Sequence, residues 1–115
     1  MPLIRIETNE EVSDQGRETI LNLMTELVVR QLNKPREYVQ IALTEKCAMA
    51  FGGTTEPAAF VEVRSLGLPD GTPKAISAEV CQILEENLRI QPNRVFINFF
   101  DMPKTHWGWN GDTFG

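Results

Sequence analysis

Four short stretches of the chain alternate apolar and polar residues, and this period of two is typical of β-strands. In the first, Ile4 and Ile6 alternate with Arg5 and Glu7. The last stretch is apolar on both sides except for Asn98. The pattern predicts strands over residues 3–8, 38–44, 59–65 and 95–100.

Two longer stretches repeat apolar residues every three to four positions, which indicates helices with one buried face. The first helix is expected over residues 14–32, with Ser13 as its N-cap and Pro35 shortly after its end. The second is expected to start at Thr72, an N-cap candidate that a proline follows, and to close before Pro92.

The order is therefore strand, helix, strand, repeated once. The two halves also share a local sequence pattern. Pro35 and Pro92 lie 57 positions apart, and each stands between the end of a helix and the start of a strand. This indicates a duplicated βαβ unit. Right-handed crossovers would place both helices on one face of a four-stranded mixed sheet, an α+β fold of two layers.

One layer of helices leaves the second face of such a sheet bare. Alternation gives this face apolar residues of its own, such as Phe60, Phe96 and Phe100. A monomer would expose them as a large apolar patch. The pattern therefore predicts an obligate homo-oligomer in which other subunits cover the face.

Composition places the chain among ordinary globular proteins. Its 115 residues are 42% hydrophobic and 23% charged, which suits one domain over residues 1–115. A net charge of −5 without a basic block argues against nucleic acid or an anionic membrane surface as a partner. No apolar run approaches ~20 residues and no signal peptide precedes the first strand, so we expect a cytoplasmic protein, with leaderless secretion left open.

The sequence offers no metal or disulfide chemistry. Cys47 and Cys81 lie far apart without a CxxC spacing, so reduced thiols are expected, and Cys81 on the apolar side of the second helix is expected to be buried. A single histidine, His106, stands in a glycine- and tryptophan-rich tail, which argues against a structural zinc site. We expect no metal, no cofactor and no catalytic role for His106.

The start of the chain, Met1-Pro2, carries the most specific chemistry. A small second residue favours removal of the initiator methionine, which would leave Pro2 as a free secondary amine. An α-amine has a reference pKa of about 7.7–8.0, and apolar surroundings lower it. Such an amine could serve as a general base near pH 7. Alternatively, the proline only stiffens the start of the strand.

Several motifs recur in an arrangement that is known from one family, and together they span nearly the whole chain. They are Met1-Pro2, Asn33-Lys34-Pro35, Met49-Ala50-Phe51-Gly52-Gly53, Glu56-Pro57, Ser65-Leu66-Gly67, the stretch from Arg94 to Met102, Gly108-Trp109-Asn110 and Thr113-Phe114. In these features the chain resembles the macrophage migration inhibitory factor family of the tautomerase superfamily.

The resemblance implies a homotrimer whose sheets line a central barrel, with an active site at each subunit interface. It also implies cofactor-free keto–enol tautomerisation of phenylpyruvate-like or dopachrome-like substrates, with Pro2 as the catalytic base. No cysteine stands in the stretch from Ala58 to Val61, where some members carry a CxxC, so the associated thiol redox activity is not expected.

The resemblance implies roles for two residues on the Pro2 side of the site. Lys34 would bind a substrate carboxylate or stabilise enolate charge. Otherwise it is a solvated lysine near a helix C-terminus. Leu66, where the family usually has isoleucine, would contact a substrate oxygen through its backbone N–H. Otherwise it is an ordinary strand-end residue.

Four further residues would complete the pocket. Phe96 and Asn98, two positions apart and so on one strand face, would come from the neighbouring subunit. Asn98 is otherwise a polar group inside the barrel. Phe96 replaces the usual tyrosine, and the lost hydrogen bond is worth ~1 kcal/mol. Tyr38 and Trp109 would form aromatic walls or pack an interface, and the bulky Trp107 would narrow the mouth.

Two other functions fit the same fold. A trimeric cytokine-like signalling protein would retain a weak or vestigial pocket, and a purely structural trimer would have no ligand. The sequence contains no receptor-binding determinant that separates these alternatives from the enzyme.

Overall fold

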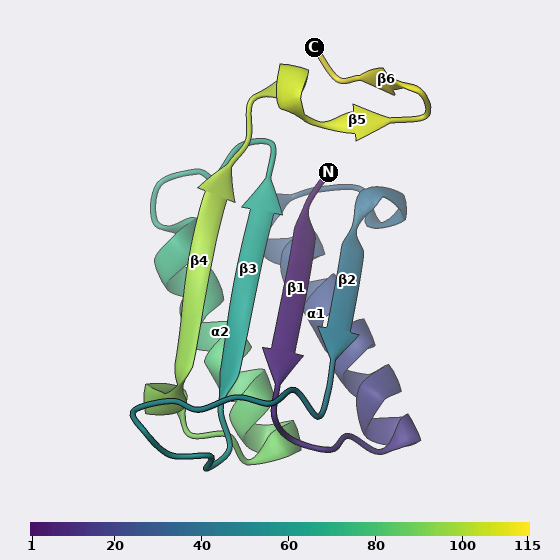
Figure 1. Ribbon diagram of the computed structural model, residues 1–115. Helices are drawn as coiled ribbons and strands as arrows, with labels where there is room; N and C mark the ends of the chain where they lie inside the picture. Colours follow the sequence, from purple (N-terminus) through teal and green to yellow (C-terminus); the bar gives the residue numbers. More distant parts are fainter.

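The computed structural model describes all 115 residues as a four-stranded sheet backed by two helices, with a small hairpin at one end (Figure 1). The main elements are β1 (Leu3–Thr8), α1 (Asp14–Leu32), β2 (Gln40–Thr44), β3 (Ala59–Ser65), α2 (Thr72–Leu88), β4 (Val95–Asp101), β5 (Gly108–Trp109) and β6 (Asp112–Thr113). Three single-turn 3-10 helices join them: η1 (Arg36–Tyr38), η2 (Pro92–Arg94) and η3 (Lys104–His106).

The sheet has the order β2-β1-β3-β4. β1 pairs in parallel with β2, and β3 pairs in parallel with β4, while the two halves meet in an antiparallel pair at the centre. Each parallel pair is joined by a helix, and both helices lie on the same face (Figure 1). The duplicated βαβ unit predicted from the sequence is therefore confirmed.

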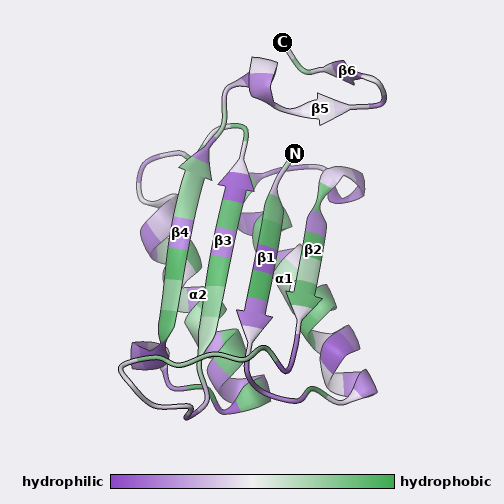
Figure 2. Cartoon of the chain, in the orientation of Figure 1, coloured by the Kyte–Doolittle hydropathy of each residue, from purple (hydrophilic) through white to green (hydrophobic).

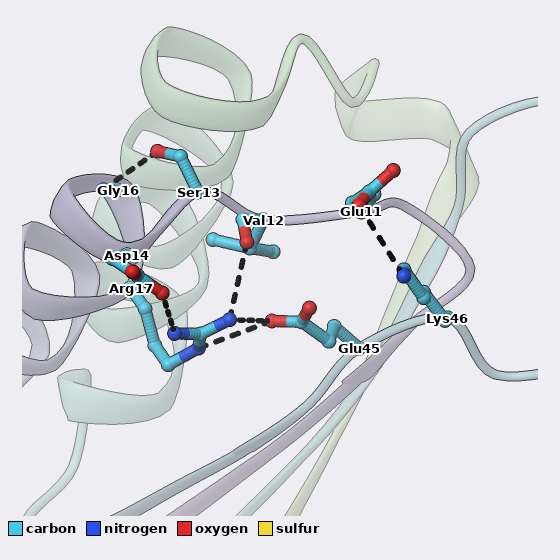
Figure 3. A network of polar contacts seen from close by, with 8 residues as sticks. All are labelled: Glu11, Val12, Ser13, Asp14, Gly16, Arg17, Glu45 and Lys46. Atoms are coloured by element: carbon cyan, nitrogen blue, oxygen red, sulfur yellow. Dashed lines mark hydrogen bonds and ion pairs between the residues drawn. The ribbon is translucent and has the colours of Figure 1, made fainter.

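The first helix begins where its sequence predicts. The hydroxyl of Ser13 accepts a hydrogen bond from the backbone N–H of Gly16 at 3.0 Å (Figure 3). This satisfies one of the free N–H groups of the first turn. Asn33 ends the helix in a left-handed conformation, with φ 51°. Lys34 thus stands just beyond the helix, at the end of the sheet where the chain begins.

The N-cap predicted for the second helix was wrong by one residue. Gly71, with φ 85°, is the cap, and Thr72 is the first helical residue. The hydroxyl of Thr72 donates to the carbonyl oxygen of Pro69 at 2.6 Å instead of accepting from the helix. A glycine accommodates this left-handed turn without steric cost.

A polar network fixes the start of α1 against the end of β2 (Figure 3). Arg17 donates through Nη1 to Asp14 and through Nη2 to Glu45, both at 2.8 Å, and Nη2 also reaches the carbonyl oxygen of Val12. The pKa of Arg17 lies above its ordinary value because of hydrogen bonds to Glu45 and Asp14. This network lies at the opposite end of the sheet from Pro2 (Figure 1).

The hydrophobic core lies between the sheet and the helices. Its fully buried members alternate along the central strands and repeat along the inner helix faces, and they include Ile4, Ile6, Val61, Val63, Ile20, Met24, Leu27, Val28, Ile76, Val80 and Leu84. These are the inward positions that both periodicities predict. No helix is both long and apolar enough to cross a membrane.

The open face of the sheet is more polar than the sequence pattern suggested. Arg5 and Arg64 share the carboxylate of Glu62, with N–O distances of 2.5 and 3.0 Å, and these hydrogen bonds lower the pKa of Glu62. Apolar residues flank this charged row, and Phe96 is 65% exposed. Figure 2 shows hydrophilic and hydrophobic residues alternating along β1 and β3. The apolar patch expected on this face is therefore interrupted by a row of charged side chains.

Candidate active site

Pro2 is buried at the start of β1, where its carbonyl oxygen accepts a hydrogen bond from the N–H of Gln40 at 3.0 Å. A cavity of about 210 Å³ opens beside it. Its lining comes from the start of the chain, from η1 and β2, and from the C-terminal hairpin. The hairpin lies across the end of the sheet at which the chain begins (Figure 1). Residues from both ends of the sequence therefore form one cavity.

Aromatic side chains form much of the cavity wall. Tyr38 and Trp109 meet edge to face, with ring centroids 5.4 Å apart. Trp109 in turn stacks on Phe114 at 5.8 Å. The structure thus places the predicted Tyr38 and Trp109 beside Pro2, together with Trp107. Phe114 was not among the predicted site residues, although an aromatic residue in a glycine-rich tail was a usable signal.

Lys34 and Leu66 come together from the end of α1 and the end of β3. The ammonium of Lys34 donates to the carbonyl oxygen of Leu66 at 3.0 Å, and both residues are half-buried. Neither side chain forms part of the cavity wall. The charge of Lys34 nevertheless acts on the chain terminus. Lys34 therefore stands at the edge of the candidate site, held by a backbone carbonyl group.

The amine at the chain terminus is electrostatically perturbed. The pKa of the Met1 amine lies below its ordinary value of 8.0, first because burial disfavours the charged form and second because Lys34 repels it. With Met1 attached, the Pro2 nitrogen belongs to a peptide bond and has no basicity. The same surroundings would act on the Pro2 amine after removal of Met1.

Phe96 and Asn98 lie away from this cavity. Both are exposed on the open face of β4, as the period of two predicted. The ring of Phe96 is 4.7 Å from that of Phe51. Asn98 lies opposite Glu62 of β3, halfway along the edge strand β4. Within one chain, the structure therefore does not bring Phe96 and Asn98 to Pro2.

Arg94, which we did not single out as a site residue, fixes the loop that carries Phe51. It donates to the carbonyl oxygens of Phe51 and Pro57, at 3.1 and 2.9 Å, and to two more carbonyl groups between them. Asn9, directly after β1, holds the same loop: its side-chain amide donates to the carbonyl oxygen of Glu56 and accepts from the N–H of Ala58. These contacts position Phe51 beside Phe96.

The remaining candidates have minor places in the site. His106 is exposed in the 3-10 turn η3. Cys81 is only partly buried, so its prediction as a buried thiol was too strong. Burial and Glu85 raise the pKa of the Cys81 thiol, which favours its protonated form.

The duplicated βαβ fold and the proline at the mouth of an aromatic cavity define a protein of the tautomerase-superfamily class. The family model described as "Macrophage migration inhibitory factor (MIF)" matches residues 1–115. The chain therefore belongs to the macrophage migration inhibitory factor family. Members of this family are generally homotrimers with small-molecule substrates, and the superfamily supports isomerase activity in general.

Individual relatives cover the chain almost end to end. Macrophage migration inhibitory factor of Xenopus laevis is 36% identical over 115 residues, which are 99% of each protein. The protein of that name from Rattus norvegicus is 32% identical with the same coverage. The crystal structure of a homologue from Prochlorococcus marinus is 38% identical, with a TM-score of 0.93 over 98% of this chain and 99% of the homologue.

Proposed function

We propose that this protein is a cofactor-free keto–enol tautomerase for phenylpyruvate-like, and also dopachrome-like, substrates, with Pro2 as the general base. The observation that carries the proposal is the position of Pro2, buried at an aromatic cavity where the terminal amine has a lowered pKa. The catalyst forms only after removal of Met1.

The proposed reaction needs one proton carrier. The neutral Pro2 amine accepts the proton of the enol hydroxyl group, and the resulting ammonium returns a proton to the neighbouring carbon, so the ketone forms without net proton change. The Lys34 ammonium binds the substrate carboxylate and offsets the negative charge that develops on oxygen. The rings of Tyr38 and Trp109 enclose the aromatic part of the substrate.

The second half of the proposed site comes from a neighbouring subunit in a homotrimer. Support comes from the open face, where Phe96 is 65% exposed and its ring packs against that of Phe51. Phe96 would supply an aromatic wall, and Asn98 would hydrogen-bond the substrate. Leu66 would contribute its backbone N–H at the Pro2 side.

The test compares enol–keto conversion of phenylpyruvate by the wild-type protein and by Pro2→Gly. Glycine at position 2 also permits removal of Met1, so mass spectra should show the processed chain in both proteins. We expect a rate loss of about 100-fold or more, the contribution typical of general-base catalysis. Equal rates would contradict the proposal and favour a cytokine-like binding protein with a vestigial pocket.

A further inference from the structure

A second cavity adjoins the one at Pro2. It has a volume of about 240 Å³ and shares Trp107 and Gly108 with the Pro2 cavity. Its other lining residues are Leu3, Arg64, Met102 and His106. The two cavities therefore lie next to each other, with the Trp107 indole as a common wall.

Arg64 is held in a fixed position at this second cavity. Its Nε and Nη2 atoms donate to one carboxylate oxygen of Glu62, at 3.3 and 3.0 Å. Its guanidinium lies 4.1 Å from the centre of the Phe100 ring. The Nη1 atom has no hydrogen-bond partner in the chain. A pre-positioned guanidinium with free N–H groups is suited to bind a carboxylate.

The charge of Arg64 is only partly neutralised. Glu62 is shared with Arg5, so the row of three side chains has two positive charges and one negative charge. No carboxylate lines the second cavity. In a chain with a net charge of −5, this cavity is thus a local site of positive charge.

The register of the sheet places this positive charge close to the proposed base. Leu3, the residue after Pro2, is the direct partner of Arg64 across β1 and β3. Lys34 approaches the same end of the sheet from the helix layer, where it binds the carbonyl oxygen of Leu66. Two cations therefore lie on the two faces of the sheet, with the start of β1 between them.

We infer that the Arg64 cavity binds a second carboxylate of the substrate, so the preferred substrates are oxo acids with a distal carboxylate. This inference rests on the proposed tautomerase function. One carboxylate of the substrate lies at Lys34, its reacting carbons lie at Pro2, and its distal carboxylate reaches Arg64 past Trp107. An oxo acid with a single carboxylate and an uncharged aromatic end, such as phenylpyruvate, fills only the first cavity.

The test measures the binding of two saturated acids that cannot tautomerise. They are 3-phenylpropanoate and its para-carboxylated analogue, titrated calorimetrically into the processed wild-type oligomer. We expect the second carboxylate to tighten binding at least fivefold at low salt. Equal affinities for the two acids in the wild-type protein would overturn the inference.

Arg64→Gln should abolish this preference, and Arg64→Lys should retain part of it because the charge remains. Arg5→Gln is the matched control, since it removes the same charge from the same row but lies outside the cavity lining. An undiminished preference in Arg64→Gln would also refute the subsite. If the wild-type protein binds the dicarboxylate more tightly but does not convert phenylpyruvate, the proposed tautomerase function is wrong and the anion-binding site is still supported.

Discussion

At the scale of single residues, the chemistry depends on the state of one amine. Burial and the nearby Lys34 charge lower the pKa of the Met1 amine, and after removal of Met1 the same surroundings would act on the Pro2 amine. A neutral amine accepts protons, whereas an ammonium does not. The lysine therefore has two roles under the proposed mechanism, because it attracts a carboxylate and also lowers the pKa of the base.

This predicts a shift in the pH dependence of Lys34→Met. A neighbouring positive charge lowers the pKa of an amine, so its removal raises the pKa of the Pro2 amine. The acidic limb of the kcat/KM profile for phenylpyruvate should move to higher pH, and KM should rise. Lys74→Met, an exposed change on α2, serves as the control. An acidic limb at the wild-type position would show that Lys34 does not act on the base.

Part of the candidate site could be predicted from the sequence, and the remaining residues were identified only from the structure. Pro2, Tyr38 and Trp109 could be predicted because an N-terminal proline and aromatic residues in set motifs carry a local signal. Arg94 and Arg64 could not, because their roles come from contacts with distant segments. Arg94 bonds carbonyl groups about 40 residues earlier in the chain, and no local pattern encodes such a partner.

At the scale of elements, periodicity and capping determined most boundaries. The first helix spans the predicted residues 14–32, since Ser13 caps it and Asn33 adopts a left-handed turn. The second strand starts later than predicted, at Gln40, because residues 36–38 form a 3-10 turn after Pro35. Alternation identified the open face but could not show that Arg5 and Glu62 are paired across strands.

The N-cap of α1 can be tested by its contribution to the stability of the fold. Ser13→Ala removes the acceptor for the Gly16 N–H and should lower the free energy of unfolding by about 1 kcal/mol. Urea unfolding at fixed protein concentration measures the change. Ser77→Ala, within α2, is the control and should cause no loss, because alanine is the better helix former there. Equal effects of the two substitutions would contradict the cap assignment.

At the scale of the whole molecule, the sheet has one covered face and one open face. The open face carries a charged row flanked by aromatic side chains, and it presents Phe96 and Asn98 outward. In the proposed trimer these residues meet the Pro2 cavity of a neighbour. The active site would then depend on assembly, because no single chain contains all of its parts.

Sedimentation should therefore give three times the subunit mass of 13.0 kDa. Specific activity should fall together with the trimer fraction under mild denaturant, before the helical circular dichroism signal is lost. A monomer that keeps full activity per subunit would refute an interface site. A mass of 13.0 kDa at assay concentration would refute the trimer itself.

The central claim is that Pro2 carries a free amine whose pKa is lowered by its surroundings. Titration of the ¹⁵N resonance of Pro2 in proline-labelled protein measures this directly. We predict an amine resonance whose midpoint lies below the ordinary α-amine value of 8.0. An amide resonance that does not titrate, or a midpoint at or above 8.0, would contradict the claim.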